Sequence, residues 1–264
     1  MRTAALALAL ALAAFATGCR HVAPALPLPD GDPRPQALLD AWRAQTEGRE
    51  ALRAVARLAV DAPGAGVGGQ DLSLRSRQRL WLARPASLRV EVLGFLDTAV
   101  AVLTTDGDRF AWLQADERRF DTGAVYEKLL WDAARLDLTP SEAVEVILGA
   151  PHPDADLRAG AAFHVGDRLR IELADDAGRV CRVVEFDAGG ELRSLEQRDT
   201  AGRRAWEVRF DDYVDLAGTR FARGVALRNG ADAGRAELTL RDVELNPALP
   251  PELFQLQDPA AEGG

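Results

Sequence analysis

Apolar and polar residues alternate with a period of two over most of this chain. In residues 88–93, Leu88, Val90 and Val92 fall on one face while Arg89 and Glu91 fall on the other, which is typical of a half-buried antiparallel strand. The alternation recurs in residues 55–60, 72–82, 99–105, 109–113 and 118–120, and again in 168–174, 180–187, 191–199, 203–210, 219–228 and 235–245. Short segments rich in Gly, Asp and Pro separate these runs, so the pattern predicts antiparallel strands joined in chain order by hairpin turns.

Two segments in the middle of the chain change to helical spacing. Residues 125–131 and 140–148 carry apolar stripes, and Val144, Ile147 and Leu148 form the second stripe. Residues 139–142 read Thr-Pro-Ser-Glu, the form of a capping box with proline at the first helical position. Gly149, followed by Pro151, is expected to end this helix.

These elements predict a mainly β fold with short helices. About 11–12 antiparallel strands in meander order, interrupted once by a helical pair, indicate a curved antiparallel sheet or unclosed β-barrel with a helical lid on its concave face. We expect this domain to span residues 36–256, with a flexible C-terminal tail at 257–264. A fold of this kind is a container.

The N-terminus has the order of a secretory signal. Arg2 precedes an apolar run over residues 4–16, and small residues lead to Cys19. Residues 16–19, Ala-Thr-Gly-Cys, resemble the bacterial lipoprotein signal, although Ala16 stands where leucine is usual. The resemblance implies that residues 1–18 are a signal peptide and that Cys19 is lipidated; a plain secretory signal with an incidental cysteine is the alternative. Arg20, in place of Asp, resembles signals sorted to the outer membrane.

The segment after Cys19 is rich in proline. Residues 19–35 contain five prolines, which favour an extended tether over a packed element, and Pro35 is suited to the first turn of a helix from about residue 36. If Cys19 is acylated, Cys181 has no disulfide partner. We expect Cys181 to lie in a strand as a small core residue.

Composition and charge narrow the classes of function. The 264 residues are 47% hydrophobic and 28% charged with a net charge of −9, a globular composition whose acidity argues against a nucleic-acid partner. Lys128 is the only lysine and is not in a phosphate-binding loop, and the three histidines are too dispersed for a zinc hydrolase motif. The glycines of residues 64–69 precede a strand-like segment, so they predict a hairpin connection. No nucleophile and base pair is visible, and we expect no enzyme activity, metal or cofactor.

From about residue 36 to residue 256 the chain resembles the LolA/LolB family of periplasmic lipoprotein carriers and outer-membrane receptors. The clearest matches are Arg84-Pro85, Leu88-Arg89-Val90-Glu91-Val92-Leu93-Gly94-Phe95-Leu96, Leu136, Leu138-Thr139-Pro140 and Val146-Ile147-Leu148-Gly149-Ala150-Pro151. The lipid anchor makes LolB, the anchored member, the closer match. The resemblance implies an unclosed barrel covered by short helices, whose hollow holds the acyl chains of a lipoprotein in transit.

The resemblance also implies site residues, partners and a location. The candidate cavity residues are Val90, Val92, Phe110, Trp112, Val144, Ile147, Trp206, Val208 and Phe210. Leu96, with Phe95 beside it, falls where the family's receptor has a protruding leucine that assists membrane insertion. The implied partners are lipoprotein acyl chains and a LolA-like carrier. The implied location is the outer membrane, lipid-anchored and facing the periplasm, and we expect a monomer.

Other functions fit the same pattern. A second hypothesis is that the container holds a different lipid or glycolipid for envelope assembly. A third is a structural lipoprotein whose interior is filled by its own side chains. An enzyme such as a hydrolase is the fourth hypothesis. Lipids that co-purify with the protein would separate the binding functions from the structural one.

Overall fold

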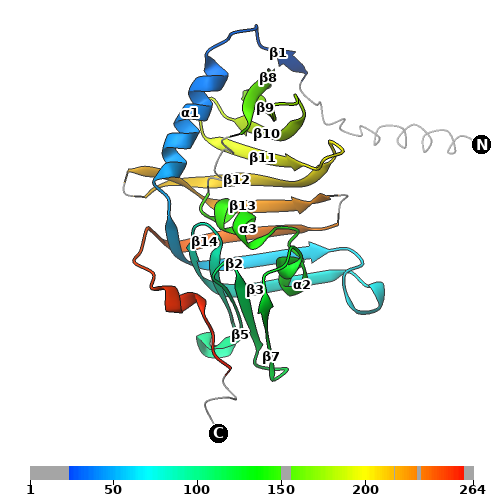
Figure 1. Ribbon diagram of the computed structural model, residues 1–264, viewed down its shortest axis with the longest axis vertical. Helices are drawn as coiled ribbons and strands as arrows, with labels where there is room; N and C mark the ends of the chain where they lie inside the picture. Colours follow the sequence, from blue (N-terminus) through cyan, green and yellow to red (C-terminus); the bar gives the residue numbers. More distant parts are fainter. Residues whose placement is uncertain (1–23, 150–155, 217, 231–232, 259–264) are drawn as a thin grey trace, which may run out of the picture.

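The computed structural model describes residues 24–149, 156–216, 218–230 and 233–258, and in this part of the chain all strands belong to one antiparallel sheet (Figure 1). The strands are β1 (Ala25–Pro27), β2 (Ala51–Ala62), β3 (Leu72–Ala83), β4 (Ser87–Leu93), β5 (Ala99–Thr105), β6 (Arg109–Gln114), β7 (Arg119–Ala124), β8 (Arg158–Val165), β9 (Arg168–Ala174), β10 (Val180–Phe186), β11 (Leu192–Arg198), β12 (Arg204–Leu216), β13 (Thr219–Asn229) and β14 (Arg235–Leu245). Their order is β1-β8-β9-β10-β11-β12-β13-β14-β2-β3-β4-β5-β6-β7. Because β1 and β7 are the two edges, the sheet is not closed into a barrel.

Three α-helices pack on this sheet. They are α1 (Arg34–Glu47), α2 (Leu129–Ala134) and α3 (Pro140–Ile147). Figure 1 shows α1 along the part of the sheet that holds β9 to β12, whereas α2 and α3 lie over the strands around β13, β14 and β2. Among the described residues, no helix combines the length and apolarity that a membrane crossing requires.

The mainly β fold, the open curved sheet and the helical lid are confirmed. The sheet has 14 strands where about 11–12 were expected. The two strands that sequence analysis did not predict, β1 and β8, pair with each other through Ala25↔Val165 and Leu26↔His164. Part of the segment expected to be a tether is therefore bound to the sheet edge. Cys19 lies outside the described residues.

The helices differ from expectation mainly at their starts. The helix expected at 125–131 is α2, which begins at Leu129, because the Val125 N–H still donates to the carbonyl of Asp108 (2.8 Å) and continues the extended chain. The helix expected at 140–148 is α3, with the predicted capping box at Thr139 and Gly149 at a positive φ of 73°. Cys181 lies in β10 as expected, but it is half-buried and outside the core.

Candidate functional site

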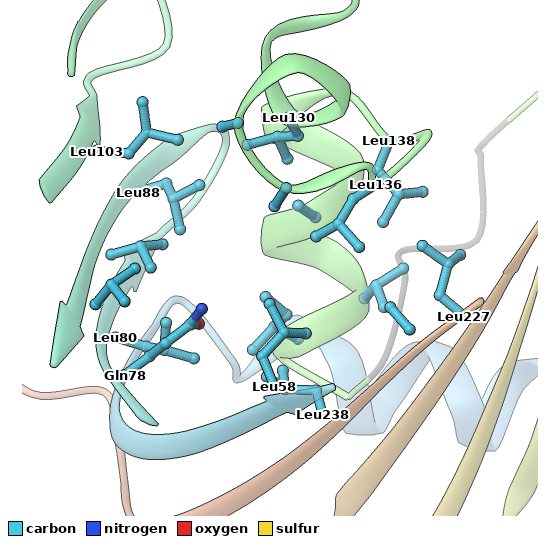
Figure 2. Close-up of a pocket in the computed structure, with 18 of the residues that line it drawn as sticks. Leu58, Gln78, Leu80, Leu88, Leu103, Leu130, Leu136, Leu138, Leu227 and Leu238 are labelled. Atoms are coloured by element: carbon cyan, nitrogen blue, oxygen red, sulfur yellow. The ribbon is translucent and has the colours of Figure 1, made fainter. Parts of the chain in front are cut away.

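An apolar cavity of about 220 Å³ lies between the concave face of the sheet and the helices α2 and α3 (Figure 2). The sheet contributes Leu58, Gln78, Leu80, Leu88, Val90, Val92, Ala101, Leu103, Trp112, Gln114, Val225, Leu227, Ala236 and Leu238, and the helical side contributes Leu130, Ala133, Ala134, Leu136, Leu138, Ala143, Val146 and Ile147. All of these residues are apolar except Gln78 and Gln114. The cavity is therefore a site for a hydrocarbon group.

Strand register brings the sheet residues together. Leu80 is opposite Val90, Val90 is opposite Leu103 and Leu103 is opposite Trp112, so one row of inward side chains crosses β3 to β6. Directly opposed residues in a ladder point to the same face of the sheet. On the helical side, Ala133, Ala134 and Ala143 have short side chains. These short side chains leave space above the row, which the helices do not fill.

The first turn of α3 is fixed by side chains. The Glu142 N–H donates to Thr139 Oγ1 (3.3 Å), and the Thr139 N–H donates to Glu142 Oε2 (2.8 Å). The indole N–H of Trp206, on β12, donates to Glu142 Oε1 (3.2 Å). The capping box satisfies the backbone donors of a helix that is too short to persist on propensity alone. Trp206 then ties this capped end to the sheet.

The last turn of α3 is held by arginines. Arg49 Nη1 donates to the carbonyl of Leu148 (3.1 Å), and the Arg49 guanidinium lies 5.6 Å from the centre of the Phe221 ring. Burial lowers the pKa of Arg49, whose residue is only 3% exposed. Arg84 pairs with Glu145 on α3, and its Nε donates to the carbonyl of Arg49 (2.7 Å). A positive group at a helix C-terminus is favoured by the helix dipole.

The connection between α2 and α3 is bound by Asn229 at the end of β13. Its Nδ2 donates to the carbonyl of Arg135 (3.1 Å), and its Oδ1 accepts from the Asp137 N–H (3.1 Å). Asn229 is buried, so both ends of its amide are used inside the protein. Sequence analysis ended the preceding strand at residue 228 and assigned Asn229 no role. The lid is therefore attached to the sheet at three points: Trp206, the two arginines and Asn229.

The loop between β4 and β5 exposes two large apolar side chains. Phe95 is 86% exposed and Leu96 is 80% exposed. The loop itself is ordered by the Gly94 N–H donating to the carbonyl of Thr98 (2.8 Å) and by an ion pair between Arg77 and Asp97 (2.7 Å). Exposed apolar groups on a fixed loop are typical of a surface that contacts a membrane or a protein.

Of the nine candidate cavity residues, four line the cavity and five lie elsewhere. Val90, Val92, Trp112 and Ile147 line the cavity. Val144, Trp206, Val208 and Phe210 are buried in the close-packed core, and Phe110 packs its ring against Tyr126 at 5.7 Å. Sequence analysis missed Leu58, Leu80, Val225 and Leu238 among others, although each lies on the inward face of an alternating strand.

Comparison with known proteins identifies the fold. No family model matches the chain, and no curated protein matches its sequence. A LolA superfamily protein from Nitrosomonas europaea superposes with a TM-score of 0.54 at 12% identity, covering 84% of this chain and 97% of that one. A DUF1329 family protein from Desulfovibrio piger gives a TM-score of 0.51 at 10% identity, covering 83% and 96%. The chain thus has the fold of a LolA superfamily protein over most of its length.

Proposed function

We propose that this chain is a lipid-anchored outer-membrane protein that takes up the acyl chains of lipoproteins in its cavity and helps to insert them into the membrane. The apolar cavity under a fastened lid is the observation that carries the proposal. The fold shared with a LolA superfamily protein supports it. Cys19, at the end of the apolar N-terminal run, would supply the anchor, because several acyl chains on one residue hold a protein on a bilayer.

The size of the cavity matches part of one acyl chain. An apolar cavity of about 150 Å³ takes up benzene, so by proportion about 220 Å³ accommodates a chain on the order of eight to ten carbons. Burial is worth about 0.8 kcal/mol per CH₂, which gives about 6–8 kcal/mol for such a segment. A bilayer offers the same gain per CH₂, so exchange between the cavity and a membrane is close to balanced. Transfer of this kind requires no bound nucleotide.

The exposed loop supplies a route for delivery. Phe95 and Leu96 lie at the tip of the β4–β5 connection, and β4 and β5 are both walls of the cavity. Insertion of this tip into a membrane would therefore bring the cavity and the hydrocarbon layer close together. We assign Leu96 the role of the insertion tip and Phe95 a supporting role.

The test is a transfer assay with a fluorescent acylated peptide as cargo. Acceptance is the transfer of this cargo from a loaded carrier to the protein, and delivery is its transfer from the protein to liposomes. Ala101→Phe places a ring in the cavity from β5, and we expect it to reduce acceptance at least tenfold. The matched control is Ala59→Phe, at a half-buried alanine of β2 that does not line the cavity. Equal acceptance by wild type and Ala101→Phe would contradict the cavity as the binding site.

A second arm of the assay separates delivery from acceptance. A charge at Leu96 resists entry into hydrocarbon, so Leu96→Glu should accept cargo normally and fail to pass it to liposomes. Leu96→Met is the matched apolar control and should deliver normally. Equal delivery by Leu96→Glu and wild type would remove the insertion role from this loop.

A further inference from the structure

Two amide side chains interrupt the otherwise apolar wall of the cavity. Gln78 on β3 is 6% exposed, and Figure 2 shows its terminal amide pointing into the cavity. Gln114 on β6 also lines the cavity, and within the described residues its buried Oε1 accepts no hydrogen bond. An unpartnered amide in an apolar cavity is unfavourable compared with an apolar side chain of the same shape. Gln114 Oε1 therefore requires a donor, whereas the Gln78 amide is partly satisfied because its Nε2 donates to Ser76 Oγ (3.2 Å).

Strand register places both glutamines in the same row of the wall that β3 to β6 form. Gln78 is opposite Val92, Val92 is opposite Ala101, and Ala101 is opposite Gln114, so the two amides are the ends of a single row across four strands. Three strand spacings separate them by about 14 Å along the sheet, and the short side chains between them leave the space above the row open. The next row is the fully apolar one that contains Leu80 and Leu103.

This row is the one nearest the exposed loop. Val92 and Ala101 are paired just before β4 and β5 are joined through residues 94–98, which carry Phe95 and Leu96. Leu88, at the opposite end of the β4 wall, is 2% exposed and surrounded by apolar groups. Along the β3–β6 wall, the row nearest the loop is therefore polar at both ends, and the rows farther from the loop are apolar.

We propose that Gln78 and Gln114 bind the polar group at the head of an acyl chain, and that an amide-linked chain is preferred to an ester-linked one. This inference rests on the proposed function and assigns it a substrate class and a binding direction. A secondary amide has both a donor and an acceptor, as the glutamine side chain does, whereas an ester has only acceptors. The hydrocarbon tail then lies against the apolar rows of the cavity, and the head group lies in the row nearest the β4–β5 loop.

A matched pair of ligands tests this preference. N-methyloctanamide and methyl octanoate have the same chain length and differ only in N–H against O at the linkage. Their binding is measured by calorimetry in detergent-free buffer on the full chain carrying Cys19→Ser, which has no acyl group of its own to enter the cavity. For each protein we take the ratio of the Kd of the ester to the Kd of the amide. This ratio is compared between the protein with the wild-type cavity and each variant, and the difference in hydration of the two ligands cancels in that comparison.

We expect Gln114→Leu to shift this ratio about three- to tenfold toward the ester, the range that one hydrogen bond supplies. Gln78→Leu should shift it in the same direction by a smaller factor, because Gln78 Nε2 already donates to Ser76 Oγ (3.2 Å). The control, Gln70→Leu in the exposed β2–β3 connection, should leave the ratio unchanged. Retained binding of methyl octanoate shows that each variant is folded with an intact cavity.

Two other outcomes separate failure of the head-group inference from failure of the proposed function. If both ligands bind and neither glutamine variant moves the ratio, the inference about the head group is overturned while the acyl site stands. If neither ligand binds to the chain with its wild-type cavity, the proposed function itself fails.

Discussion

The two halves of the sheet treat their concave faces differently. Over β9 to β12 the face is covered by α1, whose Leu39 and Trp42 are buried, and the Trp42 ring meets Phe186 edge to face with centroids 6.0 Å apart. Over β13, β14 and β2 to β6 the face is covered by α2 and α3, and the space between the sheet and these helices is the cavity. The half under α1 is filled by the protein's own side chains, which is the arrangement expected for the interior of a structural lipoprotein. The half under α2 and α3 contains the cavity.

Side-chain size explains the difference. The filled half gathers large aromatic side chains, including Trp42, Phe186 and Phe210. The cavity wall consists mainly of leucine, valine and alanine, and Trp112 is the only aromatic residue among the described residues that line it. Close packing requires that large groups fill the volume between layers. The helices that cover the two halves also differ. Helix α1 has 14 residues and no side-chain N-cap, while the 8-residue α3 has a capping box and arginine contacts. The filled half provides rigidity and the hollow half provides the site.

The largest expected effect comes from the same truncation made in each half. Leu195→Ala on β11 removes a fully buried side chain from the filled half and should lower the free energy of unfolding by about 3–5 kcal/mol. Leu103→Ala on β5 removes a side chain that already borders empty space, so it loses fewer contacts and should cost about 2–3 kcal/mol. Urea unfolding measures both.

Ligand binding should respond in the opposite sense. Leu103→Ala enlarges the cavity and should admit a longer acyl probe, whereas Leu195→Ala should leave binding by the folded protein unchanged. Equal losses of stability, together with equal binding, would show that the two halves are packed alike.

A smaller effect is expected at the lid cap. Thr139→Ala removes the acceptor for the Glu142 N–H and should destabilise α3 by about 1 kcal/mol. Because α3 covers the cavity, a bound fluorescent fatty acid should dissociate about fivefold faster, the factor that corresponds to this energy, in a stopped-flow measurement. Thr200→Ala, at an exposed turn between β11 and β12, is the matched control. An unchanged release rate in a folded Thr139→Ala protein would show that α3 does not limit release.

The sequence predicts which residues face inward more readily than it predicts which of them border empty space. Alternation within one strand places Val90 and Val92 on the same face, and both line the cavity, while the capping box correctly placed α3. Whether an inward residue lines the cavity depends on where α1 lies, and this is set by contacts between distant segments. Trp206 and Phe210 were expected to line the cavity, yet both are buried in the close-packed core, where large side chains fill the volume between the layers.

Two polar residues show the same limit. Gln78 interrupts the apolar alternation of its strand, and only the strand pairing shows that it faces inward opposite Val92. Arg49 donates to the carbonyls of Leu148 and Arg220, which are far away in the sequence and leave no local charge pattern that would indicate the contact. Such contacts follow from the fold and are not encoded locally.

The smallest expected effect is a different response of α1 and α3 to pH. At the start of α1, Asp32 Oδ1 accepts from the Arg34 N–H (2.9 Å), and the hydrogen bonds from the Arg34 side chain and backbone lower the pKa of Asp32 to about 2. Because this pKa lies below the usual carboxyl value of about 4, ionised Asp32 stabilises the helix start above pH 4, and the contribution is lost as the pH falls toward 2. Asp32 is half-buried but its partner Arg34 is exposed to solvent, so the effect is small. Amide hydrogen exchange in the first turn of α1 should become faster than that of α3 over this range. The variant Asp32→Asn is compared with wild type at each pH, which cancels the intrinsic change in exchange rate. It should abolish the pH-dependent difference in exchange between α1 and α3. An identical pH response in the variant and wild type would show that Asp32 does not hold this end of α1.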